Sequence, residues 1–289
     1  MTDDSTRLAV LIDADNTSPK LIKEMFDELA SYGTITVKRA YGDWTNPHLN
    51  GWREVLLGNA ISPQQQFAYT SGKNATDSAL IIDAMDLLYS GHVEGFAIVS
   101  SDSDFTPLAT RLRESGKRVI GVGQRKTPKA FVEACERFVF LEVLAREGVA
   151  TAQTMEPAKD EQPRPIQSVL TKAMNKVDTD DEDWASLSAL GNHLNRTDPS
   201  FDSRNYGFGR LSDLVKAQPF METRTVTAPG GRGQLWLRLK GRRPVERAPT
   251  EQPAKKVAKK GAVQKSTKKP TRRAAAKDSA SKAESGAQP

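Results

Sequence analysis

The sequence predicts an α/β fold in which a parallel sheet lies between two layers of helices, followed by a small winged-helix domain and a basic tail. Three observations support this prediction. Apolar strand-like runs alternate with helical periodicity from Arg7 to Glu142. Three helical segments and then two β-like runs follow between Ile166 and Lys240. Residues 241–289 hold 14 Lys or Arg, 4 Asp or Glu and no aromatic residue, so we expect a disordered tail.

The first domain is expected to occupy residues 1–145. Its predicted strands are residues 8–12, 34–40, 66–70, 95–100 and 118–122, with a short sixth near 138–141. Its predicted helices are residues 18–31, 47–59, 76–90, 104–115 and 128–136. Right-handed crossovers between parallel strands would gather the loops that follow the strands on one rim of the sheet.

The second domain is expected at residues 165–240, after a linker at residues 146–164 that has few large apolar side chains. Helices are predicted at residues 165–177, 184–195 and 209–217, and strands at 221–228 and 234–239. The segment Pro229-Gly-Gly-Arg-Gly233 separates the two strands. Three helices followed by a hairpin are typical of a winged helix-turn-helix. Residues 146–240 hold 13 basic and 13 acidic side chains, a balance that argues against strong duplex binding by this domain alone.

Charge and cysteine content exclude several classes of protein. The net charge of +6 comes from the tail at +10, which leaves residues 1–240 at −4. Because the charge of the tail is strongly positive, we expect it to bind phosphate backbones by electrostatic attraction. The alternative is a segment that only increases solubility. The single cysteine, Cys135, excludes an intramolecular disulfide and a cysteine-based zinc cluster. The first residues lack the basic flank and the apolar stretch that are typical of a signal peptide, and no apolar run reaches membrane-spanning length. We therefore expect a cytoplasmic protein that does not bind membranes.

Aspartates follow two of the predicted buried strands. Asp13 and Asp15 come after the first strand, and Asp102 and Asp104 come after the fourth. Asp77 begins the helix predicted at 76–90 and lies at the centre of its apolar stripe, so it should face the sheet. These carboxylates would repel one another unless a cation neutralised them. Because the sequence has no Cys or His cluster, Mg²⁺ or Mn²⁺ is the expected ion.

Helix capping is the alternative interpretation of several of these residues. Asp15, Asn16, Thr17 or Ser18 could cap the helix that follows them, and Ser103 or Asp104 could cap the helix after the fourth strand. Asp83 and Asp86 lie away from the apolar stripe of their helix, so we interpret both as solvated. Asp83 flanks that stripe and stays a candidate for the outer shell of the site.

Four segments of the first domain resemble the NYN family of PIN-like ribonuclease domains, which includes LabA-like proteins. They are Leu11-Ile-Asp-Ala-Asp-Asn16, Arg39-Ala-Tyr-Gly-Asp-Trp44, Lys73-Asn-Ala-Thr-Asp-Ser-Ala-Leu80 and Ser100-Ser-Asp-Ser-Asp-Phe105. They occur in the expected order and cover about the first half of the chain. A looser pattern around Tyr206-Gly-Phe-Gly-Arg-Leu-Ser-Asp-Leu214 resembles an OST-HTH (LOTUS) domain.

The resemblance implies a PIN-like fold and Mg²⁺- or Mn²⁺-dependent hydrolysis of RNA, in which a metal-bound water attacks the phosphodiester. It also implies that the second domain binds RNA or a protein partner. The metal-holding carboxylates would be Asp13, Asp77, Asp102 and Asp104, with Asp15 as a weaker ligand and Asn16 and Ser101 assisting. Four basic residues near the same rim are expected to touch substrate phosphates, namely Arg39, Lys73, Arg125 and Lys126.

Two other functions compete with a nuclease. The segment Asp13-Ala-Asp-Asn-Thr17 also fits the motif of haloacid-dehalogenase phosphatases, in which the first aspartate is phosphorylated. That interpretation expects a lysine before the late acidic pair, and no lysine lies between Asp77 and Asp102. The other competitor is a catalytically silent module for RNA binding or assembly. The sequence leaves open the RNA target, endo- or exonucleolytic action, the preferred metal and the oligomeric state.

Overall fold

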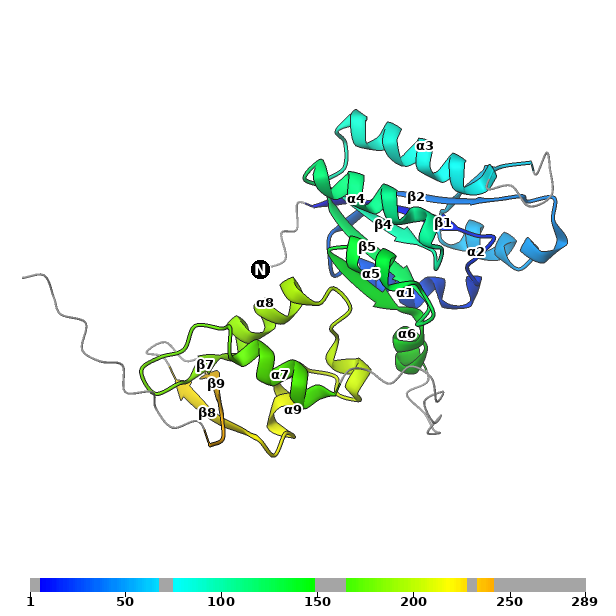
Figure 1. The fold of residues 1–289 in the computed structure, drawn as a ribbon. Coiled ribbons are helices and arrows are strands. Elements are labelled where there is room, and N and C mark those ends of the chain that lie inside the picture. The colour runs from blue at the N-terminus through cyan, green and yellow to red at the C-terminus, as the bar shows by residue number, and fades with distance from the viewer. Residues whose placement is uncertain (1–5, 68–74, 149–164, 228–232, 242–289) are drawn as a thin grey trace, which may run out of the picture. The chain divides into compact units, whose positions relative to one another are not determined.

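The structure is a computed structural model that describes residues 6–67, 75–148, 165–227 and 233–241 (Figure 1). Several predictions lie outside the described residues. These are Lys73, most of the linker, the tip of the hairpin at 228–232 and nearly all of the basic tail. None of the described helices combines the length and the apolar content that crossing a membrane requires.

A parallel sheet of six strands forms the centre of the first region, which confirms the α/β fold. The strands follow the spatial order β3-β2-β1-β4-β5-β6, and every neighbouring pair is parallel. The strands are β1 (Arg7–Asp13), β2 (Thr34–Gly42), β3 (Ser62–Gln65), β4 (Gly95–Val99), β5 (Arg118–Gly123) and β6 (Arg137–Phe140). Because β1 and β4 are neighbours at the centre, the loops that follow them lie on the same rim.

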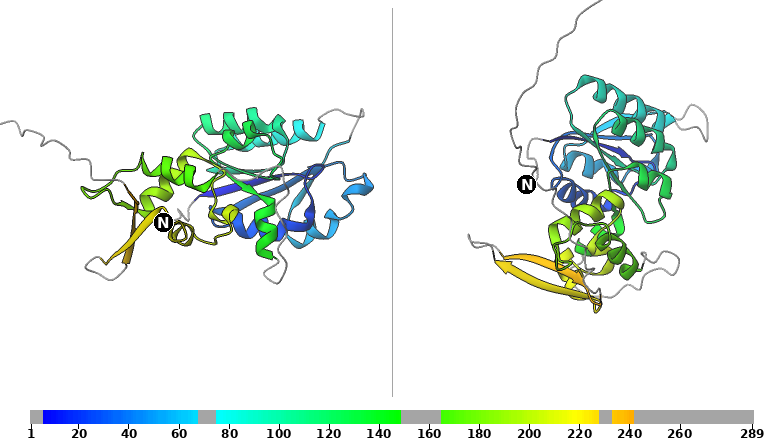
Figure 2. Two further views of the ribbon diagram at one scale, coloured as in Figure 1. Left: turned by 60° about the horizontal axis from the view of Figure 1, so that its bottom comes forward. Right: turned by 60° about the vertical axis from the view of Figure 1, so that its left-hand side comes forward.

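Helices cover both faces of this sheet, which Figure 2 shows from two sides. One face packs against α1 (Ile22–Leu29), α2 (Trp52–Gly58) and α6 (Leu141–Gly148). The other face packs against α3 (Ala75–Ser90), α4 (Thr106–Glu114) and α5 (Lys129–Ala134). Short 3₁₀ turns lead into three of these helices, at η1 (Pro19–Leu21), η2 (Pro47–Leu49) and η3 (Ser103–Phe105).

Alternation along β1 decides which face each of its side chains meets. Val10 and Ile12 enter the core beneath α1 and α2, whereas Ala9 and Leu11 enter the core beneath α3 and α4. Asp13 continues the second series at the end of the strand. The sequence therefore directs the Asp13 carboxylate toward the helix that carries Asp77.

The third strand was predicted in the wrong place. It spans Ser62–Gln65, and residues 66 and 67 are not in a strand, while residues 68–70 lie outside the described part. The apolar run around Phe67 favoured the later position. The true strand contains Pro63 and polar residues, a composition that is tolerated because β3 is an edge strand paired only with β2.

The second region contains three α-helices and a small antiparallel sheet. Its helices are α7 (Ile166–Met174), α8 (Leu187–Thr197) and α9 (Leu211–Lys216), with a 3₁₀ turn η4 (Ser203–Tyr206). Its strands are β7 (Ala185–Ser186), β8 (Met221–Thr227) and β9 (Gly233–Leu239), in the order β7-β9-β8. The predicted helix at 184–195 starts late because Ala185 and Ser186 pair with β9. The Ser186 hydroxyl then caps α8 by accepting a hydrogen bond from the backbone N–H of Ala189 at 3.1 Å.

Candidate metal centre

Asp13 ends β1 and is completely buried at the carboxyl edge of the sheet. Its carboxylate accepts three hydrogen bonds, two from Asn16 and one from Ser100. The Asn16 backbone N–H and side-chain Nδ2 lie at 3.2 and 2.9 Å, and the Ser100 hydroxyl lies at 2.7 Å. Burial nevertheless raises the pKa of Asp13 above the ordinary value, since these neutral donors do not fully replace its hydration.

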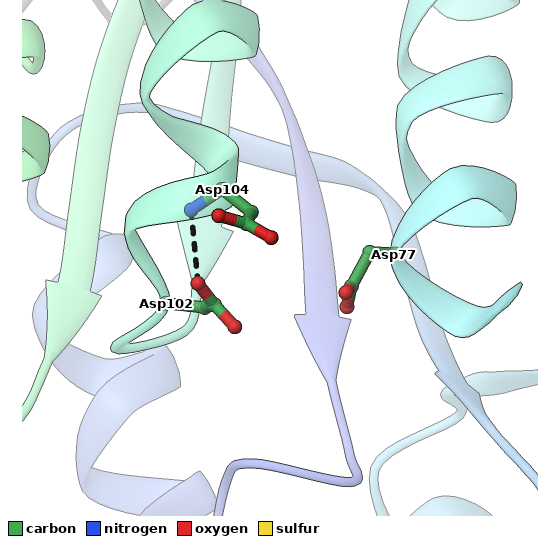
Figure 3. Close-up of side chains that lie close together, drawn as sticks. All are labelled: Asp77, Asp102 and Asp104. Atoms are coloured by element: carbon green, nitrogen blue, oxygen red, sulfur yellow. Dashed lines mark hydrogen bonds between the residues drawn. The ribbon is translucent and has the colours of Figure 1, made fainter. Parts of the chain in front are cut away.

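Three further carboxylates converge beside this buried group. Oxygen atoms of Asp77, Asp102 and Asp104 all lie within 4.8 Å of one another. Asp77 projects from the first turn of α3, and the other two come from the turn that follows β4 (Figure 3). A helix that crosses between parallel strands starts on the rim where the strands end, which explains how residues 25 positions apart meet. The inward face predicted for Asp77 matches this arrangement.

The turn after β4 is ordered by its own side chains. The Asp102 carboxylate caps η3 by accepting a hydrogen bond from the backbone N–H of Asp104 at 2.9 Å (Figure 3). The backbone N–H of Asp102 donates to the Ser100 hydroxyl at 3.1 Å. Ser100 therefore connects the buried Asp13 carboxylate to the backbone of the exposed loop, and one side chain fixes both halves of the site.

Burial and repulsion from the neighbouring carboxylates raise the pKa of Asp77. Its pKa is raised to about 6, first by burial and then by the charges of Asp13, Asp102, Asp104 and Asp15. A divalent cation bound among these oxygens would offset both effects. Carboxylate oxygens at this spacing are the donors that Mg²⁺ and Mn²⁺ prefer. The residues present therefore fit the ion that the sequence predicts.

Asp15 and Asn16 flank the cluster and have different contacts. Asp15 accepts a hydrogen bond from the Thr76 hydroxyl at 2.8 Å, which ties the loop after β1 to the first turn of α3. Asn16 folds back onto Asp13 through both of its donors. Both residues are exposed, and their contacts give them roles in holding Asp13 and the Asp77 turn in place.

The predicted phosphate-binding residues do not form one group. Arg39 pairs with Asp83 on α3. The Arg125 backbone N–H donates to the Glu142 carboxylate at 3.0 Å, and its guanidinium lies 5.5 Å from the centre of the Phe140 ring. Lys126 is exposed on the loop after β5, the same rim as the carboxylates.

Ser100 is the site residue that the sequence reasoning missed, since Ser101 was chosen instead. The Ser101 hydroxyl accepts a hydrogen bond from the backbone N–H of Gln124 at 2.8 Å and so joins the segments that follow β4 and β5. Strand parity could have found Ser100, because it continues the series Phe96 and Ile98 that faces α3 and α4. The backbone of Gly123 also lies close to Ser100. A Cβ on Gly123 would lie 2.6 Å from the Ser100 carbonyl oxygen, so this position requires glycine.

Family models match both regions of the chain. The NYN domain model matches residues 7–142, and the OST-HTH/LOTUS domain model matches residues 160–231. Among curated proteins, an uncharacterized protein of Methanocaldococcus jannaschii is 29% identical over 121 residues, which are 40% of this chain and 47% of that protein. The chain thus spans about half the length of the curated relative that it matches.

Solved structures resemble parts of the chain. A crystal structure of a protein of unknown function from Vibrio parahaemolyticus aligns with 49% of this chain and 96% of its own, at 20% identity and a TM-score of 0.40. A solution NMR structure of a Chromobacterium violaceum protein is 38% identical and covers 30% of this chain and 90% of its own, with a TM-score of 0.24.

Proposed function

The chain carries an NYN domain joined to an OST-HTH/LOTUS domain, and from this premise we propose that it is a divalent-metal-dependent ribonuclease. The observation that carries the proposal is the convergence of Asp77, Asp102 and Asp104 beside the buried Asp13 carboxylate. NYN domains are generally ribonucleases with a nuclease-like fold, and an OST-HTH domain suggests RNA binding.

Mg²⁺ or Mn²⁺ would be held by Asp77, Asp102 and Asp104, with the Asp13 carboxylate completing the acidic set. When bound there, the ion would supply an activated water and charge neutralisation at the phosphodiester. The chain itself supplies the orientation of these groups. Ser100 and Asn16 fix Asp13, and the capped turn holds Asp102 and Asp104. At neutral pH, Asp77 is mostly ionised because its pKa of about 6 lies below 7.

Substrate contacts are proposed for the basic residues of the same rim. Lys126 is exposed, and the backbone bond from Arg125 to Glu142 leaves the loop after β5 ordered. We propose that Lys126 and Arg125 contact substrate phosphates rather than bases. Substrate contact by Lys73 and the assisting role of Ser101 stay predictions.

The second region and the tail would retain the RNA, or a protein partner, near the nuclease domain. The basic tail has the charge for sequence-independent phosphate binding. Removing residues 241–289 is expected to weaken RNA binding for all sequences and to flatten its salt dependence. Affinity and salt slope equal to those of the full chain would contradict this role. We place the protein in the cytoplasm, in keeping with its single buried cysteine.

The decisive experiment is incubation of the purified chain with labelled single-stranded and structured RNA in Mg²⁺, Mn²⁺ or EDTA. Asp13→Asn and Asp102→Asn should abolish cleavage, and EDTA should do the same. Asp86→Asn is the matched control, because Asp86 is exposed on α3. Equal cleavage by the wild type and both site variants would show a contaminating nuclease and sink the proposal. RNA binding by the wild type without cleavage would instead support a silent binding module.

A further inference from the structure

Asp83 joins α3 to the neighbouring strand through two side chains. Its carboxylate accepts hydrogen bonds from the Arg39 guanidinium and from the Tyr41 hydroxyl, both on β2. The Arg39 and Asp83 side chains are 32% and 23% exposed, whereas those of the surface pair Arg7 and Glu94 are 46% and 43% exposed. The contact is therefore partly shielded from solvent, where a hydrogen-bonded ion pair holds its geometry better than at the surface.

Both ends of this contact lead to the candidate metal centre. Asp83 lies six residues after Asp77 on α3, a distance of about 9 Å along the helix axis. Tyr41 is buried and lies directly opposite Asp13 in the register of β1 and β2. The Tyr41 carbonyl accepts a hydrogen bond from the backbone N–H of Ala14 at 2.9 Å. One short path thus connects the helix that carries Asp77 with the strand end that carries Asp13.

We infer that Asp83 is a positioning residue, which uses Arg39 and Tyr41 to hold the first turn of α3 and so keeps Asp77 at its place among the carboxylates. The inference rests on the proposed metal-dependent function. It assigns Arg39 to this contact instead of to substrate phosphate. It also corrects the solvated position expected for Asp83, whose side chain is partly buried and contacts two residues of β2.

The energetics favour a tether over an incidental pair. Without Asp83, the buried Tyr41 hydroxyl and the Arg39 guanidinium would both lose their acceptor in the described structure, which costs more than a solvated contact. Oxygen atoms of Asp77, Asp102 and Asp104 lie within 4.8 Å of one another, so the first turn of α3 meets like charges when no cation is bound. A contact further along α3 would oppose that repulsion.

Four variants separate the tether from simple charge effects. Asp83→Ala removes both hydrogen bonds and leaves Arg39 unpaired, whereas Arg39→Met/Asp83→Ala removes the same bonds and leaves the net charge of the chain unchanged. Tyr41→Phe removes one bond and preserves the aromatic packing. Asp86→Asn, on the exposed side of the same helix, is the control. Two readouts are used on the full chain. The first is hydrogen exchange in EDTA at the backbone amides of residues 79–82, which donate to the carbonyls of the α3 first turn. The second is the dissociation constant for Mn²⁺.

The expected result is an increase of about 10-fold in both the exchange rate and the Mn²⁺ dissociation constant for Asp83→Ala and for the double variant. Tyr41→Phe should change both by about 3-fold, and Asp86→Asn should change neither. Wild-type values for the double variant would overturn the inference, because charge alone would then explain the single variant. Exchange in EDTA needs no metal, so it still decides the tether if the wild type neither binds Mn²⁺ nor cleaves RNA, an outcome that refutes only the proposed function.

Discussion

Two acidic groups in this chain have opposite surroundings. At the edge of the parallel sheet, Asp77 faces other carboxylates, and its pKa rises to about 6. In the second region, Asp180 and Glu182 both pair with Arg224, at 2.8 and 3.1 Å. Glu222 lies on β8, the strand that carries Arg224, and forms a further ion pair at 2.7 Å with Arg238 on β9.

Aromatic rings make the second arrangement possible. The Arg224 and Arg238 guanidinium groups lie 4.3 and 4.8 Å from the centre of the Trp184 ring, so the acids hold two cations against an aromatic surface. The run from Asp178 to Asp183 is denser in acids than any of the segments that supply the candidate metal centre. Even so, among the described residues the group that could hold a metal is the one at Asp77. The density of acids along the sequence therefore does not predict which carboxylates converge in space.

The largest difference between the two groups should appear in catalysis. Asp102→Asn removes a carboxylate from the proposed metal site and is expected to lower RNA cleavage by about 10³-fold, equivalent to about 4 kcal/mol of transition-state stabilisation. Glu222→Gln disrupts an ion pair of the second region and should leave the turnover rate unchanged. The measurement is single-turnover cleavage of labelled RNA in Mn²⁺. Comparable losses of cleavage rate in Asp102→Asn and Glu222→Gln would contradict a catalytic difference between the two acidic groups.

Metal binding should raise the unfolding free energy of the chain through the carboxylates around Asp77, and the ion pairs of Arg224 should not contribute to this gain. At a Mn²⁺ concentration of 100 times its dissociation constant, the wild type should gain about 2.7 kcal/mol of unfolding free energy. Asp77→Asn should lose most of this gain, and Arg224→Met should keep it. Thermal unfolding with and without Mn²⁺ provides the measurement. A full gain in the Asp77 variant would show that the ion binds elsewhere.

Much of the site could be predicted because its signals are local. Asp13 ends one apolar strand, Asp102 follows another, and the helical period of 3.6 residues predicts that Asp77 faces the sheet. The pair between Arg39 and Asp83 could not be predicted in this way. It joins a strand to a helix 44 residues later, and no periodicity within either element identifies the partner.

The position of the edge strand β3 and the contact of Ser100 with Asp13 were not predicted, for different physical reasons. Edge strands need little apolar character, so Ser62–Gln65 resembled a loop and its apolar neighbours were chosen instead. Ser100 and Ser101 are adjacent and chemically identical, and only the face to which each points separates their roles. That face follows from strand parity, which places Ser100 on the side of Asp13.

Loss of the Arg224 guanidinium, with its ion pairs and its contact with the Trp184 ring, should have a moderate effect on stability. Arg224→Met removes two ion pairs and the stacking over Trp184, and we expect the unfolding free energy to fall by about 1 to 2 kcal/mol. The matched control is Arg111→Met, which removes an exposed pair with Glu114 at 3.9 Å and should cost at most about 0.5 kcal/mol. Urea unfolding measures both. Equal losses would show that the Trp184 ring adds nothing.

The smallest effect concerns the acidic edge without metal. Because the pKa of Asp77 is raised from 3.8 to about 6, the folded state takes up this proton more readily than the unfolded state. The resulting stability is complete below pH 3.8 and is lost as the pH rises through 6. Asp77→Asn, which stays neutral, should therefore be more stable than the wild type in EDTA at pH 8, by about 1 kcal/mol after solvent screening.

The two proteins should converge in stability near pH 4, where Asp77 is mostly protonated in the folded state. Asp86→Asn controls for the loss of any aspartate on α3 and should show no such pH dependence, because Asp86 is exposed. Adding Mn²⁺ at pH 8 should reverse the order and make the wild type the more stable protein. A difference between the wild type and Asp77→Asn that stays constant from pH 4 to 8 would mean that Asp77 does not bear the repulsion of the site. The contrast with the ion-paired acids of the second region would then lose its electrostatic basis.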